Sequence, residues 1–168
     1  MKNKIHIVQG EIWNIRVDAI ICHANTELER EDPITCRLLE IGGEDIQNEC
    51  NSITKLEKGK AVATSAGNLP AQYLIHAVLQ ERQEQAEEEQ VMQAMREALL
   101  VAKQKKVRTV SLSLIGQNDE IPIKRAAELL LTEIKKHFDD ETTIEKICFV
   151  VPDEASYEAL DDAIKQLS

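Results

Sequence analysis

Short β-type segments alternate with helical periodicities along most of the chain, and this alternation limits the choice of fold more than any other feature. Apolar residues around Ile5 and Ile7 are spaced as in a strand, and Ala19–Cys22 form an uninterrupted apolar run that is typical of a buried strand. Further strands are predicted at 61–64, 73–79, 107–115 and 147–151. Helical patterns fall between them, which predicts an α/β domain with helices on both faces of a central sheet.

The predicted helices carry recognisable start and stop signals. Asp32 and Pro33 are suited to the N-cap and first position of a helix that the pair Gly42–Gly43 would end. A second short helix is expected through Ile46 and Cys50, and two later helices are expected after Pro122 and around Leu160.

The most biased segment is the acidic run 81–90, which leads into Val91, Met95 and Leu99 at helical spacing. Carboxylates near a helix N-terminus interact favourably with the macrodipole, so the run indicates a helix with an acidic first turn rather than an acidic interaction tail.

Composition restricts the function. The chain has 168 residues, with 30 Asp and Glu against 20 Lys and Arg, which gives a formal charge of -10. This balance argues against non-specific binding of nucleic acid or anionic membranes. There is no apolar run near the roughly 20 residues of a membrane span and no signal-peptide pattern. We therefore expect one cytoplasmic domain over residues 1–168.

The four cysteines do not form a metal-binding pattern. Cys22, Cys36, Cys50 and Cys148 are far apart and include no CxxC pair. They are expected to be reduced and mostly buried, and the sequence predicts no resident metal or cofactor.

Three stretches of sequence together resemble the macrodomain family. The first is QGEIW at 9–13 with VDAIICHAN at 17–25, the second runs from Gly59 through GKAVATSAGNLP to Val78, and the third is VRTVSLSLI at 107–115. The resemblance implies a three-layer α/β/α fold with a mixed sheet of six or seven strands. It also implies a module that binds ADP-ribose or a related adenine nucleotide and in some members hydrolyses its derivatives.

The resemblance places a ligand along specific residues. Glu11 and Ile12 stand where the family recognises adenine, Pro152 stands where an aromatic ring often stacks, and Asn25 matches the residue that orients the distal ribose. Cys22 replaces the first asparagine of that motif. The ligand-binding positions implied in this way are Glu11, Ile12, Asn25, Glu31, Asp32, Ile34, Gly116, Gln117, Asn118 and Pro152.

The two loops that hold the diphosphate in the family differ from the family pattern. Residues 29–33 contain no glycine, and Asp32 as N-cap would satisfy the N–H groups that a phosphate would otherwise use. Glu31 adds a negative charge, which at about 4 Å from a phosphate costs roughly 1 to 4 kcal/mol. The second loop keeps Gly116 but gains two carboxylates at 119–120. Because asparagine can adopt a positive φ, Asn118 is expected to keep a turn here.

Two histidines are candidate site residues. His23 follows a predicted strand near the expected cleft, but no acid or base partner accompanies it at a recognisable spacing, which favours a structural or surface role. His76 lies inside an apolar strand and is expected to be a core residue.

Three hypotheses follow from these residues. The favoured one is a divergent module with weakened or lost ADP-ribose binding, which retains adenine recognition or serves in protein interaction. The second is an active ADP-ribosyl or O-acetyl-ADP-ribose hydrolase in which Asn25 positions the ribose. In the third, Glu29, Glu31, Asp32, Asp119 and Glu120 converge on Mg²⁺ or Ca²⁺.

Overall fold

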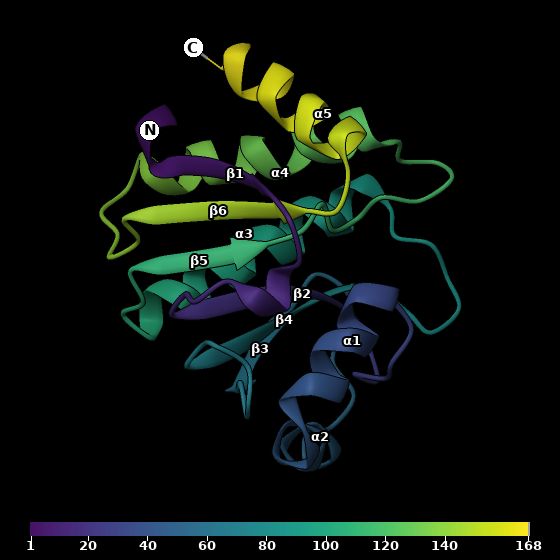
Figure 1. Cartoon of the computed structure of the whole chain (residues 1–168). Helices are drawn as coiled ribbons and strands as arrows, with labels where there is room; N and C mark the ends of the chain where they lie inside the picture. The colour runs from purple at the N-terminus through teal and green to yellow at the C-terminus, as the bar shows by residue number, and fades with distance from the viewer. Residues whose placement is uncertain (168) are drawn as a thin grey trace.

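A six-stranded sheet forms the centre of the molecule in the computed structural model, which describes residues 1–167 (Figure 1). The strand order is β1-β6-β5-β2-β4-β3, parallel throughout except for the antiparallel edge strand β3. The strands are β1 (Ile5–Gln9), β2 (Ala19–Asn25), β3 (Ala61–Ser65), β4 (Tyr73–Gln80), β5 (Thr109–Leu112) and β6 (Lys146–Val151). The predicted mixed sheet of a three-layer α/β/α fold is confirmed.

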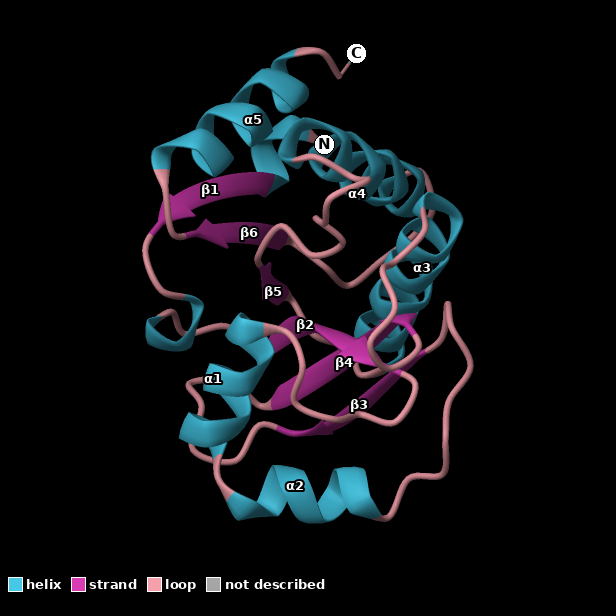
Figure 2. Cartoon of the chain, turned by 90° about the vertical axis from the view of Figure 1, so that its right-hand side faces the viewer, coloured by secondary structure: helices cyan, strands magenta, loops and turns pink. Residues whose placement is uncertain are grey.

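Helices cover both faces of the sheet (Figure 2). The helices are α1 (Pro33–Gly42), α2 (Glu44–Asn51), α3 (Glu88–Gln104), α4 (Ile123–Phe138) and α5 (Glu154–Lys165), with short 3-10 turns η1 (Lys2–Lys4) and η2 (Ile12–Asn14). Side chains of α3, α4 and α5 pack with Ile21 in one core cluster, whereas α1 and α2 pack with Ile20 and Cys22 in the other. Neighbouring residues of β2 thus serve opposite faces, as the strand period of two requires.

Both core clusters are built almost wholly from aliphatic side chains. Phe149 is the large aromatic residue among the fully buried side chains of the described residues, and Ile20, Leu74 and Leu99 are typical of the rest. Because β2 and β4 are central strands, their apolar runs are buried on both faces.

Two predicted element boundaries are wrong. The helix expected from the acidic run begins only at Glu88, because residues 81–87 form a loop in which Gln83 has a positive φ of 64°. Glu88 and Glu89 still occupy its first turn. The strand expected over 107–115 is shortened to Thr109–Leu112, since Ser113 and Leu114 lie beyond the strand and a turn begins at Ile115.

Candidate functional site

The topology brings the predicted site residues to one edge of the sheet. Because β1, β6, β5 and β2 are parallel neighbours, their carboxyl ends lie side by side. Gln9 pairs with Val151, and the Gly10 amide donates to the Val151 carbonyl at 2.8 Å. Glu11 and Pro152, which follow these two strands, are therefore adjacent at this edge. Ligands of open α/β sheets bind at such carboxyl ends.

At the adenine end of the predicted site, a carboxylate remains accessible. Glu11 is exposed and accepts a hydrogen bond of 3.3 Å from the Asn14 amide on η2. Ile12 is buried beneath it, at 3 % exposure, and anchors this turn in the core. Pro152 lies exposed directly after β6. Glu11 thus presents a hydrogen-bond acceptor to solvent at this edge of the sheet, and Pro152 presents an apolar surface.

The side chain of Asn25 is enclosed by its own loop. It is 2 % exposed, and its Oδ1 accepts hydrogen bonds from the backbone amides of Glu27 and Glu29 at 3.0 and 3.1 Å. Its Nδ2 donates to Glu31 Oε2 at 2.8 Å. Asn25 therefore shapes the turn after β2 and has both polar atoms engaged within the protein.

Glu31 folds back over the ends of β2 and β4. Besides the Asn25 amide, its carboxylate accepts the Gln83 backbone N–H at 2.8 Å and the Gln80 amide at 3.3 Å. Hydrogen bonds to a charged carboxylate are stronger than those between neutral groups, so all three donors are held by Glu31. Arg30, the neighbouring cation, is exposed.

Asp32 caps α1, as the sequence predicts. Its Oδ2 accepts the backbone N–H groups of Ile34 and Thr35, each at 3.1 Å. The Thr35 hydroxyl donates to the His23 carbonyl at 2.6 Å and so ties the first turn of α1 to β2. The N–H groups at this helix N-terminus are thus satisfied by the protein itself.

The second loop is held by a glycine and an asparagine. Gly116 has φ +90°, and a β-carbon there would meet Val91 of α3 at 2.9 Å. The turn expected at Asn118 is present, although Asn118 has no positive φ and forms the turn through its side chain. Its Oδ1 accepts the amides of Glu120 and Ile121, and its Nδ2 donates to the Ala86 carbonyl at 3.0 Å. Gln117 is exposed at the top of this loop.

His23 takes part in the same polar network through a residue that the sequence analysis missed. Its Nε2 lies 2.8 Å from Oε1 of Gln80. Since Gln80 Nε2 donates to Glu31 and to the Glu84 carbonyl, Gln80 Oε1 must be the acceptor and His23 Nε2 carries a proton. The only signal for Gln80 in the sequence is its position as the polar residue that follows the run Leu74–Leu79. That run is apolar except for His76.

His76 is a core residue, as predicted. It is 1 % exposed, and burial lowers its pKa to about 4. The Thr64 hydroxyl donates to the Ser65 carbonyl, so it accepts from His76 Nε2 at 3.0 Å, which leaves Nδ1 to accept the thiol of Cys22 at 3.7 Å. Burial raises the pKa of the Cys22 thiol, and all four cysteines are free thiols.

The acidic loop residues do not converge on a common point. Glu29 pairs with Arg82 at 3.1 Å, Asp119 accepts from Gln85 at 3.4 Å, and Asp32 caps a helix. No group of three or more His, Cys, Asp or Glu side chains within residues 1–167 is arranged to hold a metal ion. The hypothesis of a Mg²⁺ or Ca²⁺ site on these five carboxylates is therefore wrong, because each is taken up by a local donor or lies apart.

No helix within residues 1–167 is long and apolar enough to cross a membrane.

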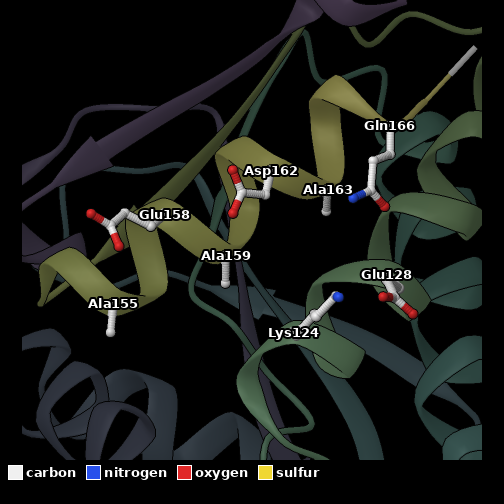
Figure 3. A pocket seen from close by; sticks show the side chains of 8 residues that line it. All are labelled: Lys124, Glu128, Ala155, Glu158, Ala159, Asp162, Ala163 and Gln166. Atoms are coloured by element: carbon white, nitrogen blue, oxygen red, sulfur yellow. The ribbon is translucent and has the colours of Figure 1, made fainter.

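Several hollows indent the described surface, and one of them is lined by Thr26 and Glu81, which follow Asn25 and Gln80 in the sequence. Five of them have volumes of about 240 to 500 Å³, and none of these five is lined by a predicted ligand-binding residue. One, of about 310 Å³, lies between α4 and α5, where Ala155, Ala159 and Ala163 face Lys124 and Glu128 (Figure 3). Its walls are small apolar and charged side chains, and we assign no ligand to it.

Comparison with known proteins agrees with this fold. The model of the macro domain family matches residues 22–130. An O-acetyl-ADP-ribose deacetylase 2 of Pantoea vagans is 33 % identical over 163 residues, which are 93 % of this chain and 95 % of that protein. A macro domain-containing protein of Caldanaerobacter subterraneus is 30 % identical and covers 99 % of both chains.

Solved macrodomain structures superpose closely. The Trypanosoma brucei macrodomain in complex with ADP-ribose has a TM-score of 0.86 at 20 % identity, over 96 % of this chain and 69 % of that one. The Oceanobacillus iheyensis macrodomain with ADP has a TM-score of 0.81 at 23 % identity, over 95 % and 88 %. At this level of identity the agreement concerns the fold.

Proposed function

This chain belongs to the macro domain family, whose members bind ADP-ribose, and we propose that it is a divergent member with weakened ADP-ribose binding. Its own carboxylates occupy donors that would otherwise face the diphosphate of the ligand. Adenine-nucleoside recognition remains at the other end of the site.

The observation that carries this proposal is the cap of α1. One oxygen of Asp32 accepts both Ile34 N–H and Thr35 N–H. A helix N-terminus binds a phosphate through such free N–H groups and through the macrodipole, and a capping carboxylate competes for both. A ligand diphosphate would have to displace Asp32 and would then lie close to its negative charge.

The adenine end supports retained recognition of the nucleoside. Glu11 is exposed and can accept the hydrogen bond of an adenine amino group, while Ile12 fixes the backbone beside it. Pro152 offers a flat apolar face without π electrons, so it contributes less than an aromatic ring would. Adenosine, which lacks the diphosphate, avoids the unfavourable end of the site.

Calorimetric titration tests this proposal. ADP-ribose and adenosine are titrated into the protein at equal concentrations and low salt. We expect the two ligands to bind with similar affinities, both weaker than about 10 µM, because the diphosphate adds nothing. A sub-micromolar dissociation constant for ADP-ribose would contradict the proposal.

The second candidate function is hydrolysis of O-acetyl-ADP-ribose. It is favoured by the name of the Pantoea vagans relative, and in it Asn25 would orient the distal ribose. Release of acetate from O-acetyl-ADP-ribose at high enzyme concentration measures it, with Asn25→Asp as the variant that keeps the shape of the side chain. Loss of turnover in this variant, with the fold retained, supports hydrolysis. The absence of turnover in the wild-type protein excludes this candidate function.

A further inference from the structure

One side chain joins three segments of the chain at the carboxyl edge of the sheet. Glu31 accepts hydrogen bonds from Asn25 at the end of β2, from Gln80 at the end of β4, and from the Gln83 backbone in the β4–α3 loop. Asn25 and Gln80 are 2 % and 8 % exposed, whereas Glu31 itself is exposed. The two buried amides are therefore covered by the carboxylate of Glu31. Because Glu31 is exposed, its carboxylate can turn into the solvent and be hydrated there.

The backbone on both sides of this contact is held in an unusual conformation. Leu28 has φ 55° and Gln83 has φ 64°, in the left-handed region that residues with a β-carbon rarely adopt. Leu28 is 5 % exposed and is fixed by the core, but Gln83 is exposed. The hydrogen bond from its N–H to Glu31 therefore helps hold Gln83 in place.

Besides the backbone hydrogen bond from the Thr26 N–H to the Gln80 carbonyl and the contact of His23 with Gln80, two solvent-exposed ion pairs lie in this part of the chain. Arg82 pairs with Glu29 at 3.1 Å and Lys58 with Glu84 at 3.9 Å, each with side chains more than a third exposed. Pairs of this kind contribute little. Glu31 accepts from buried side chains at the ends of both strands.

We infer that Glu31 is an autoinhibitory latch: an internal carboxylate that occupies the donors of Asn25, Gln80 and Gln83 and excludes an anionic ligand group from them. This inference rests on the proposed function, because it concerns the same end of the same site. It adds that the site is closed by a reversible contact, so that removing a single carboxylate opens it. Asp32 stays in place when the latch is released, so the gain in affinity is partial.

The variants Glu31→Gln and Glu31→Ala test the latch, with Glu27→Gln as the matched control. Glu27 is an exposed carboxylate on the same segment, so its replacement removes the same charge without freeing the three donors. In Glu31→Gln an amide hydrogen must face one of the donors, and in Glu31→Ala the acceptor is absent. ADP-ribose is titrated calorimetrically into all four proteins, and inorganic pyrophosphate serves as a probe of the anion site alone.

We expect both Glu31 variants to bind ADP-ribose and pyrophosphate about tenfold more tightly than the wild-type protein, as is typical for freeing donors that bond to charged groups. Glu27→Gln should stay within about twofold. Amide hydrogen exchange of residues 81–87 should become faster in the Glu31 variants only.

Equal affinities in all four proteins would overturn the latch, as would an equal gain in Glu27→Gln, which would indicate net charge alone. No detectable binding in either Glu31 variant would overturn it as well. The wild-type titration by itself decides the proposed function, whereas the ratio of variant to wild type decides the latch. Thermal unfolding verifies that each variant is folded.

Discussion

The amide nitrogen of Asn25 donates to the carboxylate of Glu31 across 2.8 Å, so the asparagine that we predict to orient the distal ribose is bound to its own chain. Both of its polar atoms are used within the turn after β2. In the proposed function, this contact places a negative charge near the expected position of the ligand diphosphate.

Asn25→Asp should destabilise the protein through repulsion from Glu31. Two carboxylates would then face each other, and at a separation of about 4 Å their repulsion costs roughly 1 to 4 kcal/mol of unfolding free energy. The double variant Asn25→Asp with Glu31→Gln restores a donor opposite the new carboxylate and should recover most of the loss. Urea unfolding of the four proteins measures the coupling, and additive effects would show that the two side chains do not interact.

Asp32→Ala should lower the unfolding free energy by about 1 kcal/mol, because two N–H groups of α1 lose their acceptor. Asp153→Ala is the matched control, since Asp153 caps α5 through the Ser156 N–H at 2.8 Å. Both variants should lose similar stability in urea unfolding, but only Asp32→Ala should gain affinity for ADP-ribose. A gain in both would contradict the role of the α1 cap.

Acid should destabilise the protein through His76. Burial lowers the pKa of His76 from 6.5 to about 4, so between these values the unfolded chain binds a proton that the folded protein excludes. Its contribution to stability is complete above pH 6.5 and is lost as the pH falls toward 4. The unfolding free energy should therefore fall by about 1 kcal/mol between pH 6 and pH 5.

Urea unfolding of wild type, His76→Gln and His137→Gln at both pH values separates the sources of this dependence. The pKa of His137 is also lowered, by burial and by Lys103, so it acts in the same direction. In each variant, the remaining pH dependence of the unfolding free energy should be the part that the other histidine contributes. An unchanged slope in His76→Gln would exclude His76 as the cause.

Gly116→Ala should cost about 2 kcal/mol of unfolding free energy. The residue has φ +90°, and the new methyl group would press on Val91 at 2.9 Å. In Gly10→Ala the added carbon meets only Val8 at 3.9 Å, which is ordinary contact. Thermal unfolding compares the two, and equal losses would show that the second loop tolerates a side chain.

The fold was predictable because its signals are local. Strand and helix periods, Asp32 followed by Pro33, and Gly42 followed by Gly43 each determine a few neighbouring residues, and the α1 cap forms as expected. The start of α3 at Glu88 was missed because residues 81–87 make contacts with residues some 50 positions earlier, such as that of Gln83 with Glu31. Local patterning carries no information on such pairings.

The candidate site was predictable only in part for the same reason. The order of the strands brings Glu11, Pro152, the Gly116 loop and Asn25 to one edge, as the resemblance implies. The bridging role of Gln80 and the folding back of Glu31 depend on side-chain geometry between distant segments. Whether these residues bind a ligand remains a prediction.

Amide NMR of the α1 N-terminus tests the central claim most directly. ADP-ribose is titrated into the ¹⁵N-labelled protein, and the resonances of Ile34 and Thr35 are followed. We predict that neither amide shifts in a saturable manner below about 10 µM ligand, because Asp32 holds both N–H groups. Saturable shifts of both amides at lower ligand concentrations would contradict the account, since the phosphate would then have displaced the carboxylate.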